Sequence, residues 1–292
     1  MKSPALPKIG SVAALKAVRE QACSGKPDPS GGAQRQILVC FGGSCLASGA
    51  KEVRDALRDA LTKEGLADGV ALVETGCMGP CVIGPVIMVG EDRTFYQGVK
   101  PEDAAEIVAS HLRDGRRVER LLVTDPSGKT PAPCRDSLDF FKRQTQVVLR
   151  NCGWINPDKI QEYIGRDGYA ALAKVLTEAT PAAVIEEMKI SGLRGRGGAG
   201  FPTWLKWHLA SQTPQGMRYV LCNADEGDPG AYMDRSVLEG DPHSVIEGMA
   251  IAAYAIGAPQ GYVYVRAEYP LAVERLSHAI EQARACGLLG KK

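Results

Sequence analysis

Four of the nine cysteines fall into two closely spaced pairs. Cys40 and Cys45 are spaced C-x4-C, and Cys77 and Cys81 are spaced C-x3-C. Each pair follows an apolar run that predicts a β-strand, and nearby glycines leave backbone N–H groups free to point at sulfur. Thiolates are soft ligands that suit iron–sulfur clusters or zinc, although zinc sites favour the tighter C-x2-C pair. We therefore expect a [2Fe–2S] cluster, with zinc or free redox-active thiols as the alternatives.

The remaining five cysteines have no partner at ligand spacing: Cys23, Cys134, Cys152, Cys222 and Cys286. An odd total, in a chain whose N-terminus does not resemble a signal peptide, argues against a disulfide framework. We therefore expect a cytoplasmic protein. The four histidines also lack ligand spacing, and His243 is expected to be structural.

A glycine-rich stretch, GLRGRGGAG, runs from residue 192 to residue 200. It satisfies G-x-G-x-x-G, but the dinucleotide-binding form of that motif follows a strand, and this stretch follows a helical pattern. Lys206 is wrongly spaced for a Walker loop, and a single embedded RGRGG is not a repetitive RNA-binding tract. Bare backbone N–H groups nevertheless let an anion approach closely, and a helix after Pro202 would add its positive end. A flexible hinge is the alternative.

A second polar group follows the predicted strand RYVLCNA, residues 218–224. Asn223, Asp225, Glu226 and Asp228 crowd its carboxyl end, which is where ligands bind in doubly wound sheets. Carboxylates there could accept hydrogen bonds from ribose or flavin groups. An acidic surface turn is the alternative.

Two sets of elements must position these groups. Residues 37–41, 70–74, 86–89 and 94–98 are predicted strands and residues 48–64 and 101–115 are predicted helices, in the order β-α-β-β-β-α. After residue 136 the patterns are helical up to the glycine stretch. A short helix near 204–211 and the strand 218–224 follow. A helix near 242–257, the strand 261–267 and a helix from Pro270 then begin a doubly wound α/β sheet. Val273, Leu276, Ile280 and Ala283 are expected on one face of that last helix.

Composition excludes two broad classes of partner. The formal net charge is +1, so there is no global field to attract nucleic acid. No apolar run reaches the ~18 residues of a membrane helix, so we expect no direct membrane insertion.

Three stretches carry a family resemblance. CFGGSC and TGCMGPC resemble the thioredoxin-like [2Fe–2S] ferredoxins, which suits the first set of elements. SGLRGRGGAGFPTWLKW and CNADEGDPGAYMDR resemble the FMN- and NADH-binding F subunit of NADH:quinone oxidoreductase. They also resemble the β subunits of NAD-linked or bifurcating hydrogenases and formate dehydrogenases. The resemblance implies four segments: an N-terminal extension and linker (1–35), a [2Fe–2S] domain (36–118), a linker (119–135) and an incomplete FMN/NADH-binding domain (136–292).

The resemblance also implies roles for individual residues. The cluster ligands would be Cys40, Cys45, Cys77 and Cys81. The cofactor-binding residues would be Gly195, Arg196, Gly197, Gly198, Phe201, Lys206, Asn223, Asp225, Glu226 and Asp228, with Phe201 and Asp228 facing the dinucleotide. Two positions depart from the family pattern, which usually has Gly at Trp204 and often has Glu at Asp228.

The implied function is an electron-transfer flavoprotein subunit that oxidises NAD(P)H, or reduces NAD(P)+, through FMN and iron–sulfur clusters. Its partners would be other subunits of a hydrogenase, formate dehydrogenase or NADH dehydrogenase complex, with a ferredoxin also possible. The family's [4Fe–4S] cluster has no ligands here, because the sequence contains no C-x2-C, so we expect a fragment or a split polypeptide. The alternative is a non-enzymatic [2Fe–2S] electron carrier with a truncated flavin domain.

Overall fold

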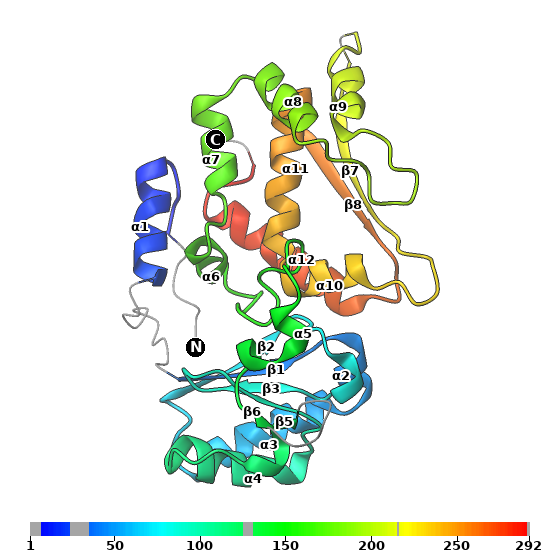
Figure 1. Ribbon diagram of the computed structural model, residues 1–292. Coiled ribbons are helices and arrows are strands. Elements are labelled where there is room, and N and C mark those ends of the chain that lie inside the picture. The colour runs from blue at the N-terminus through cyan, green and yellow to red at the C-terminus, as the bar shows by residue number, and fades with distance from the viewer. Residues whose placement is uncertain (1–6, 24–34, 125–130, 215, 291–292) are drawn as a thin grey trace.

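The computed structural model describes residues 7–23, 35–124, 131–214 and 216–290, and it shows two α/β units joined side by side (Figure 1). We call residues 35–142 the N-terminal unit and residues 143–290 the C-terminal unit. Parts of the expected N-terminal extension and linker (1–35) and of the expected linker (119–135) lie outside the described residues.

The N-terminal unit is a four-stranded mixed sheet in the order β2-β1-β3-β4. Its strands are β1 (Arg35–Cys40), β2 (Val70–Thr75), β3 (Ile87–Val89) and β4 (Thr94–Tyr96). Strands β1 and β2 are parallel, whereas β3 is antiparallel to both β1 and β4. The four strands of this sheet and the helix expected over residues 48–64 therefore all form where the apolar runs predict them.

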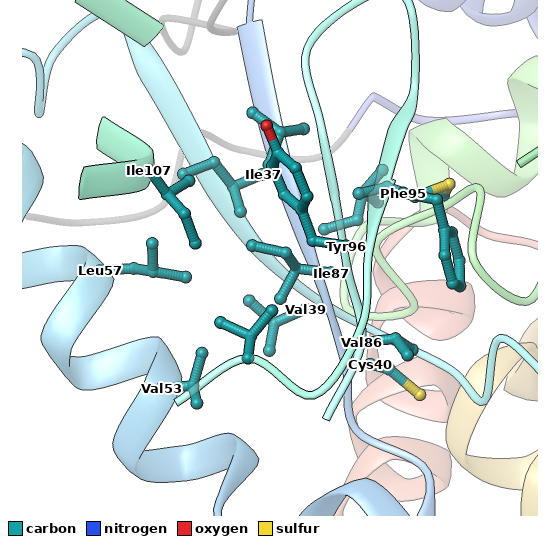
Figure 2. Packing of buried hydrophobic residues seen from close by; sticks show 14 of the residues in the cluster. Ile37, Val39, Cys40, Val53, Leu57, Val86, Ile87, Phe95, Tyr96 and Ile107 are labelled. Atoms are coloured by element: carbon teal, nitrogen blue, oxygen red, sulfur yellow. The ribbon is translucent and has the colours of Figure 1, made fainter. Parts of the chain in front are cut away.

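Helices cover one face of this sheet. Helix α3 (Ala50–Lys63) buries Val53, Leu57 and Leu61, as its i, i+4, i+8 spacing predicts. Helix α4 (Ala104–Glu106) continues into a π-helix (Ile107–Arg113) in place of the single helix expected over 101–115. Figure 2 shows Ile37 and Leu57 pointing into the layer between sheet and helices, with Phe95 on the other side of the sheet.

The rest of the N-terminal unit is short elements. These are α2 (Gly43–Ala47), α5 (Asp139–Lys142), β5 (Val123–Thr124), β6 (Pro131–Ala132) and the 3-10 turns Cys81–Ile83, Pro101–Asp103, Glu119–Leu121 and Arg135–Ser137. Leu138 and Phe141 belong to the same core as Phe95, whose ring meets that of Phe141 edge-on at 5.9 Å. Chain beyond residue 118 thus helps to build the first core.

The C-terminal unit is mostly helical around a two-stranded parallel sheet. Its helices are α6 (Ile160–Gly165), α7 (Ala170–Glu178), α8 (Pro181–Ile190), α9 (Thr203–Ser211), α10 (Met233–Gly240), α11 (Pro242–Ile256) and α12 (Pro270–Ala285), and its strands are β7 (Tyr219–Ala224) and β8 (Gln260–Val265). The strand–helix–strand–helix order is confirmed, whereas the helical pattern expected over residues 136–191 is interrupted by turns at residues 143–159. Helix α10 was not expected, and on the predicted apolar face of α12 Leu276 and Ala283 are buried while Val273 is 44% exposed.

Only one face of the β7–β8 sheet is covered by described residues. Helix α11 contacts both strands, while the alternate side chains on the other face are exposed. Tyr219 and Leu221 of β7 and Tyr262 and Tyr264 of β8 are between 41% and 75% exposed. The period-2 alternation of a strand places these side chains on one surface.

A buried polar network holds the helices together. The Glu247 carboxylate accepts hydrogen bonds from the Tyr163 hydroxyl (2.6 Å) and the backbone N–H of Tyr169 (2.7 Å). The hydroxyl of Tyr169 lies 2.8 Å from His243 Nδ1, and His243 Nε2 lies 3.1 Å from Gln282 Oε1. Burial lowers the pKa of His243 to about 4. His243 is therefore a core residue, in keeping with its expected structural role.

The N-terminal helix belongs to the C-terminal unit. Helix α1 (Val12–Cys23) packs against α6 and buries Leu15 and Val18 in the same core as Tyr163. The backbone N–H of Ile9 also donates to the carbonyl of Cys286 at 2.7 Å. Residues near the start of the chain thus complete a core whose other residues lie about 150 or more positions further along the chain. The sequence patterns did not predict this contact.

The two units meet where β2 ends. Thr75 Oγ1 donates to the Ile155 carbonyl and accepts from the Gly153 N–H, both at 3.0 Å. Next to it, a Cβ placed on Gly76 would lie 2.5 Å from Gly240 Cα and 3.0 Å from Cys152 Sγ. The junction therefore has no room for a side chain at residue 76.

The described helices include none with the length and apolar character that a membrane span requires.

Gly76→Ala is expected to lower the free energy of unfolding by about 2 kcal/mol, because overpacking a close contact costs ~1–3 kcal/mol. The matched control is Gly248→Ala in α11, where an added Cβ meets nothing within 4 Å and where alanine should be neutral or stabilising. Denaturant unfolding of both variants checks this, and equal stabilities would contradict the close packing of the two units.

Candidate functional site

The four paired cysteines come together at the end of the N-terminal sheet. Cys40 ends β1, Cys45 lies in α2, Cys77 follows β2, and Cys81 begins a 3-10 turn. Cys40 and Cys45 are buried, whereas Cys81 is exposed. The Sγ atoms of Cys77 and Cys81 lie 3.9 Å apart, and the backbone N–H of Met78 points at Cys40 Sγ from 3.4 Å. Both sequence pairs thus converge on one place.

These thiols perturb one another's ionisation. Hydrogen bonds that the Cys40 thiol donates to Cys45 and Cys77, together with burial, raise the pKa of Cys40 well above its ordinary value. The hydrogen bond to Cys40 is the main cause that lowers the pKa of Cys77 to about 6, while burial raises that of Cys81 to about 11. Four ionised thiols at this spacing need a cation to offset their repulsion.

Glycines keep the space beside the thiols clear. A Cβ on Gly42 would lie 2.9 Å from Cys77 Cβ, and a Cβ on Gly84 would lie 2.9 Å from Cys45 Sγ. No group of three or more His, Cys, Asp or Glu side chains in the described ranges is arranged around one metal ion. A [2Fe–2S] cluster instead takes four thiolates on two irons. The donor set and the glycine-lined approach fit such a cluster.

The glycine stretch forms a loop between α8 and α9. Two backbone hydrogen bonds close the base of this loop. The Gly195 N–H donates to the Phe201 carbonyl (2.8 Å), and the Thr203 N–H donates to the Leu193 carbonyl (3.1 Å). At its tip, Gly198 has a φ of 98°, which favours glycine. A Cβ on Gly197 or Gly198 would meet nothing within 4 Å. Bare backbone is therefore open to solvent at the tip, where a ligand can approach it.

The charged and aromatic residues around this loop are accessible to a ligand from solvent. Arg196, Phe201 and Lys206 are exposed. Arg196 and Lys206 have no ion-pair partner among the described residues, so both cations are available to an anion. Helix α9 begins at Thr203, directly after Pro202, and directs the positive end of its dipole toward the loop. The expectation of a helix N-terminus at this position is confirmed.

Trp204 does not crowd the loop. Its ring lies 5.3 Å from Lys189 Nζ and 6.4 Å from the His208 ring. It lines a cavity of about 710 Å³ between α8, α9 and α11. The departure from the family's usual glycine is therefore accommodated on the side of α8, away from the glycine tip.

The polar residues at the carboxyl end of β7 lie close together in the chain. Asn223, within β7, and Asp225 and Asp228, in the loop that follows, are exposed. Glu226 has a left-handed φ of 43°, and its carboxylate accepts the backbone N–H groups of Asp234 (2.8 Å) and Arg235 (3.0 Å) at the start of α10. Within the described residues, no hydrogen bond or ion pair joins this loop to the glycine loop. Glu226 thus caps a helix, a role that the sequence analysis missed.

Helix α10 extends from this capped end to the cysteine site (Figure 1). The Arg235 side chain reaches α2: a Cβ built on Gly43, the first residue of α2, would lie 3.1 Å from Arg235 Nη1. Its Nε donates to the buried Glu239 carboxylate at 2.8 Å. Arg275, which is 2% exposed, donates to the carbonyls of Glu239 (2.5 Å) and Glu74 (3.2 Å). The i, i+4 spacing of Arg235 and Glu239 was the one sequence signal for this pair.

Two family descriptions match the chain. "Thioredoxin-like [2Fe-2S] ferredoxin" matches residues 28–112, and "Nuo51 FMN-binding domain" matches residues 188–289. The chain joins a thioredoxin-like [2Fe–2S] ferredoxin domain to an Nuo51 FMN-binding domain. Its α/β fold class and the FMN and [2Fe–2S] character of its two domains follow from these matches.

The relatives are subunits of larger enzymes. The NADP-reducing hydrogenase subunit HndC of Solidesulfovibrio fructosivorans is 60% identical over 150 residues, 51% of this chain and 30% of that protein. The NAD-reducing hydrogenase HoxS subunit alpha of Cupriavidus necator is 33% identical over 267 residues, 90% of this chain and 42% of that protein. The chain therefore spans well under half the length of either relative.

A solved structure is also similar to part of the chain. The thioredoxin-like [2Fe–2S] ferredoxin from Aquifex aeolicus is 37% identical, over 33% of this chain and 94% of that chain, with a TM-score of 0.30.

Glu226→Ala is expected to lower the free energy of unfolding by about 2 kcal/mol, because hydrogen bonds to a charged group contribute ~1.5–3 kcal/mol. Amide hydrogen exchange in α10 should accelerate. Asp225→Ala, one residue away in the same exposed loop, is the control and should stay within ~0.5 kcal/mol of the parent chain. Unchanged exchange in α10 of the Glu226 variant would refute the capping role.

Proposed function

We propose that this chain is an electron-transfer flavoprotein subunit that oxidises NAD(P)H, or reduces NAD(P)+, through FMN and a [2Fe–2S] cluster. The observation that carries the proposal is one helix, α10, in contact with both candidate sites. Its first turn is capped by Glu226 of the strand-end loop, and Gly240 at its other end packs on Gly76, next to Cys77. A single rigid element thus links a flavin-type site to a cluster site.

In this proposal the four paired cysteines hold the cluster. Cys40, Cys45, Cys77 and Cys81 supply thiolates, and the Met78 N–H directed at Cys40 Sγ stabilises negative charge on that sulfur. Gly42 and Gly84 keep side chains out of the space beside the sulfurs. The partly buried position of three of these thiols limits the access of water.

The glycine loop and the strand-end loop bind the flavin and the nucleotide in this proposal. Backbone N–H groups of Gly197 and Gly198 and the cations Arg196 and Lys206 would bind the FMN phosphate, with Gly195 lining the site. Asn223, Asp225 and Glu226 would accept hydrogen bonds from flavin or ribose, with Phe201 and Asp228 against the dinucleotide. FMN, when bound, supplies hydride acceptance followed by one-electron transfer, which no side chain provides.

The setting is also part of the proposal. The relatives are named as subunits, so we assign the partners as other subunits of a hydrogenase, formate dehydrogenase or NADH dehydrogenase complex, or a ferredoxin. We place the chain in the cytoplasm, because none of its nine cysteines forms a disulfide and a reducing compartment maintains that state.

Gly197→Val tests the flavin site. The fold has room for this side chain, since a Cβ there meets nothing and the φ is not left-handed. If the FMN phosphate contacts this backbone, FMN binding should weaken by about tenfold or more, equivalent to ~1.4 kcal/mol. Gly10→Val is the matched control at an equally open glycine.

FMN titration followed by flavin fluorescence measures both variants. Equal affinities in the two would remove the glycine loop from the flavin site. A parent chain that holds iron and sulfide but binds no added FMN would instead support the non-enzymatic [2Fe–2S] carrier.

Cysteine substitutions test the cluster ligands. Replacing any one of Cys40, Cys45, Cys77 and Cys81 by alanine should abolish most of the iron, labile sulfide and visible absorbance of anaerobically purified chain, because each cysteine is one of four ligands. Cys222→Ala, in β7, should keep the parent's iron content. Full iron in a Cys77→Ala chain would contradict the assignment.

A further inference from the structure

An arginine cluster surrounds Trp154 at the junction of the two units. The guanidinium carbons of Arg93, Arg135 and Arg166 lie 3.1, 5.3 and 4.8 Å from the centre of a Trp154 ring. Arg93 and Arg135 come from the N-terminal unit, whereas Trp154 and Arg166 come from the C-terminal unit. None of these residues belongs to the cysteine site or the glycine loop.

The cluster carries more positive charge than its acidic neighbours balance. Asp136 alone pairs with it, at 4.0 Å from Arg93 and 3.4 Å from Arg135, and the Asp136 side chain is 67% exposed. Arg166 forms no ion pair within the described part of the chain. Burial, with repulsion from Arg135 and Arg166, lowers the pKa of Arg93 to about 10 despite the attraction of Asp136.

Two other carboxylates lie near Arg166. The buried Asp241 accepts a hydrogen bond from the neutral Asn151 amide at 2.8 Å and attracts Arg166. Asp167 pairs with Arg19 of α1 at 2.6 Å. Arg93, Arg135, Arg150 and Arg166 therefore still exceed the negative charge that Asp136 and Asp241 supply.

A cavity of about 250 Å³ opens among these residues. It is lined by Arg135, Arg150, Arg166, two glutamines and the rings of Phe141 and Trp154. Arg135 is 7% exposed, and its buried Nε has no hydrogen-bond partner in the described residues. Its Nη2 is held by Gln146 Oε1 at 2.6 Å. A buried donor without a partner is costly, so the guanidinium of Arg135 is incompletely satisfied at the wall of this cavity.

We propose that this junction cavity binds the phosphoryl group of a small ligand. Guanidinium groups present planar forks that match phosphate oxygens, and three of them line one cavity. The volume exceeds that of a single phosphate, which leaves space for an attached group. Since the arginines come from both units, bound phosphate would also hold the units together. The inference is independent of the flavin and cluster assignments.

The test uses the full 292-residue chain with its cysteines reduced, in a phosphate-free buffer. Inorganic phosphate and AMP are titrated separately, at constant ionic strength set with chloride, and binding is followed by calorimetry and by the thermal midpoint. We expect saturable binding and a higher midpoint. Binding of both probes identifies a ligand-borne phosphoryl group, and binding of inorganic phosphate alone identifies the free ion.

Variants separate the cavity from general charge effects. Arg135→Gln and Arg150→Gln should each weaken phosphate binding by about tenfold, since each removes a charge-assisted contact. The Arg150 side chain is exposed and makes no hydrogen bond within the described residues, so this variant keeps the fold even if Arg135→Gln does not. Arg284→Gln, an exposed arginine at the end of α12, is the control.

Two outcomes would overturn the proposal. One is the absence of saturable binding of either probe beyond the effect of chloride. The other is a phosphate affinity in Arg150→Gln equal to that of Arg284→Gln.

Discussion

Gly76 and Gly240 pack backbone against backbone, and the relation between the two units depends on that contact. The residue after Gly76 is Cys77, a proposed cluster ligand, and the residue before Gly240 is the buried Glu239. Neither glycine could carry a Cβ without displacing the backbone of the other glycine or the side chain of Cys152. Because protein interiors are close-packed and transmit displacement, a shift of α10 would move the loop that presents Cys77.

Buried charge reinforces this contact at a single point. Arg275 reaches across the junction to the carbonyls of Glu74 and Glu239, and its guanidinium lies 3.7 Å from the Glu74 carboxylate. An isolated buried guanidinium would be unfavourable, so its partners from both units must be present together. The cavity beside Trp154 is the opposite case. There, arginines from both units lie close together, and Asp136 is the carboxylate that forms ion pairs with them among the described residues. One part of the junction is thus electrostatically satisfied, and another is open to an anion.

The two candidate sites differ in how complete they are. The cysteine site has its four donors and its glycine-lined space, and Cys40 and Cys45 belong to the core of the N-terminal unit. The flavin-type site consists of two loops on a sheet with one exposed face, where Leu221 is 75% exposed. Glycine at the loop tip keeps backbone N–H groups available, but burial of a flavin ring needs walls on both sides. The described residues supply the phosphate-binding features more fully than the ring pocket.

Local patterns in the sequence predict most of the strands and helices, both cysteine pairs and the helix N-terminus after the glycine loop. These are local features, set by side-chain periodicity, spacing and the conformational freedom of glycine. Only the tertiary structure brought Cys40 beside Cys77, placed α1 in the distant core, and gave Glu226 and Arg235 their partners. It also exposed Val273, because the partner helices of α12 lie elsewhere on its surface. Such contacts depend on which surfaces meet, and a one-dimensional pattern does not record residues that are close in space but far apart in the chain.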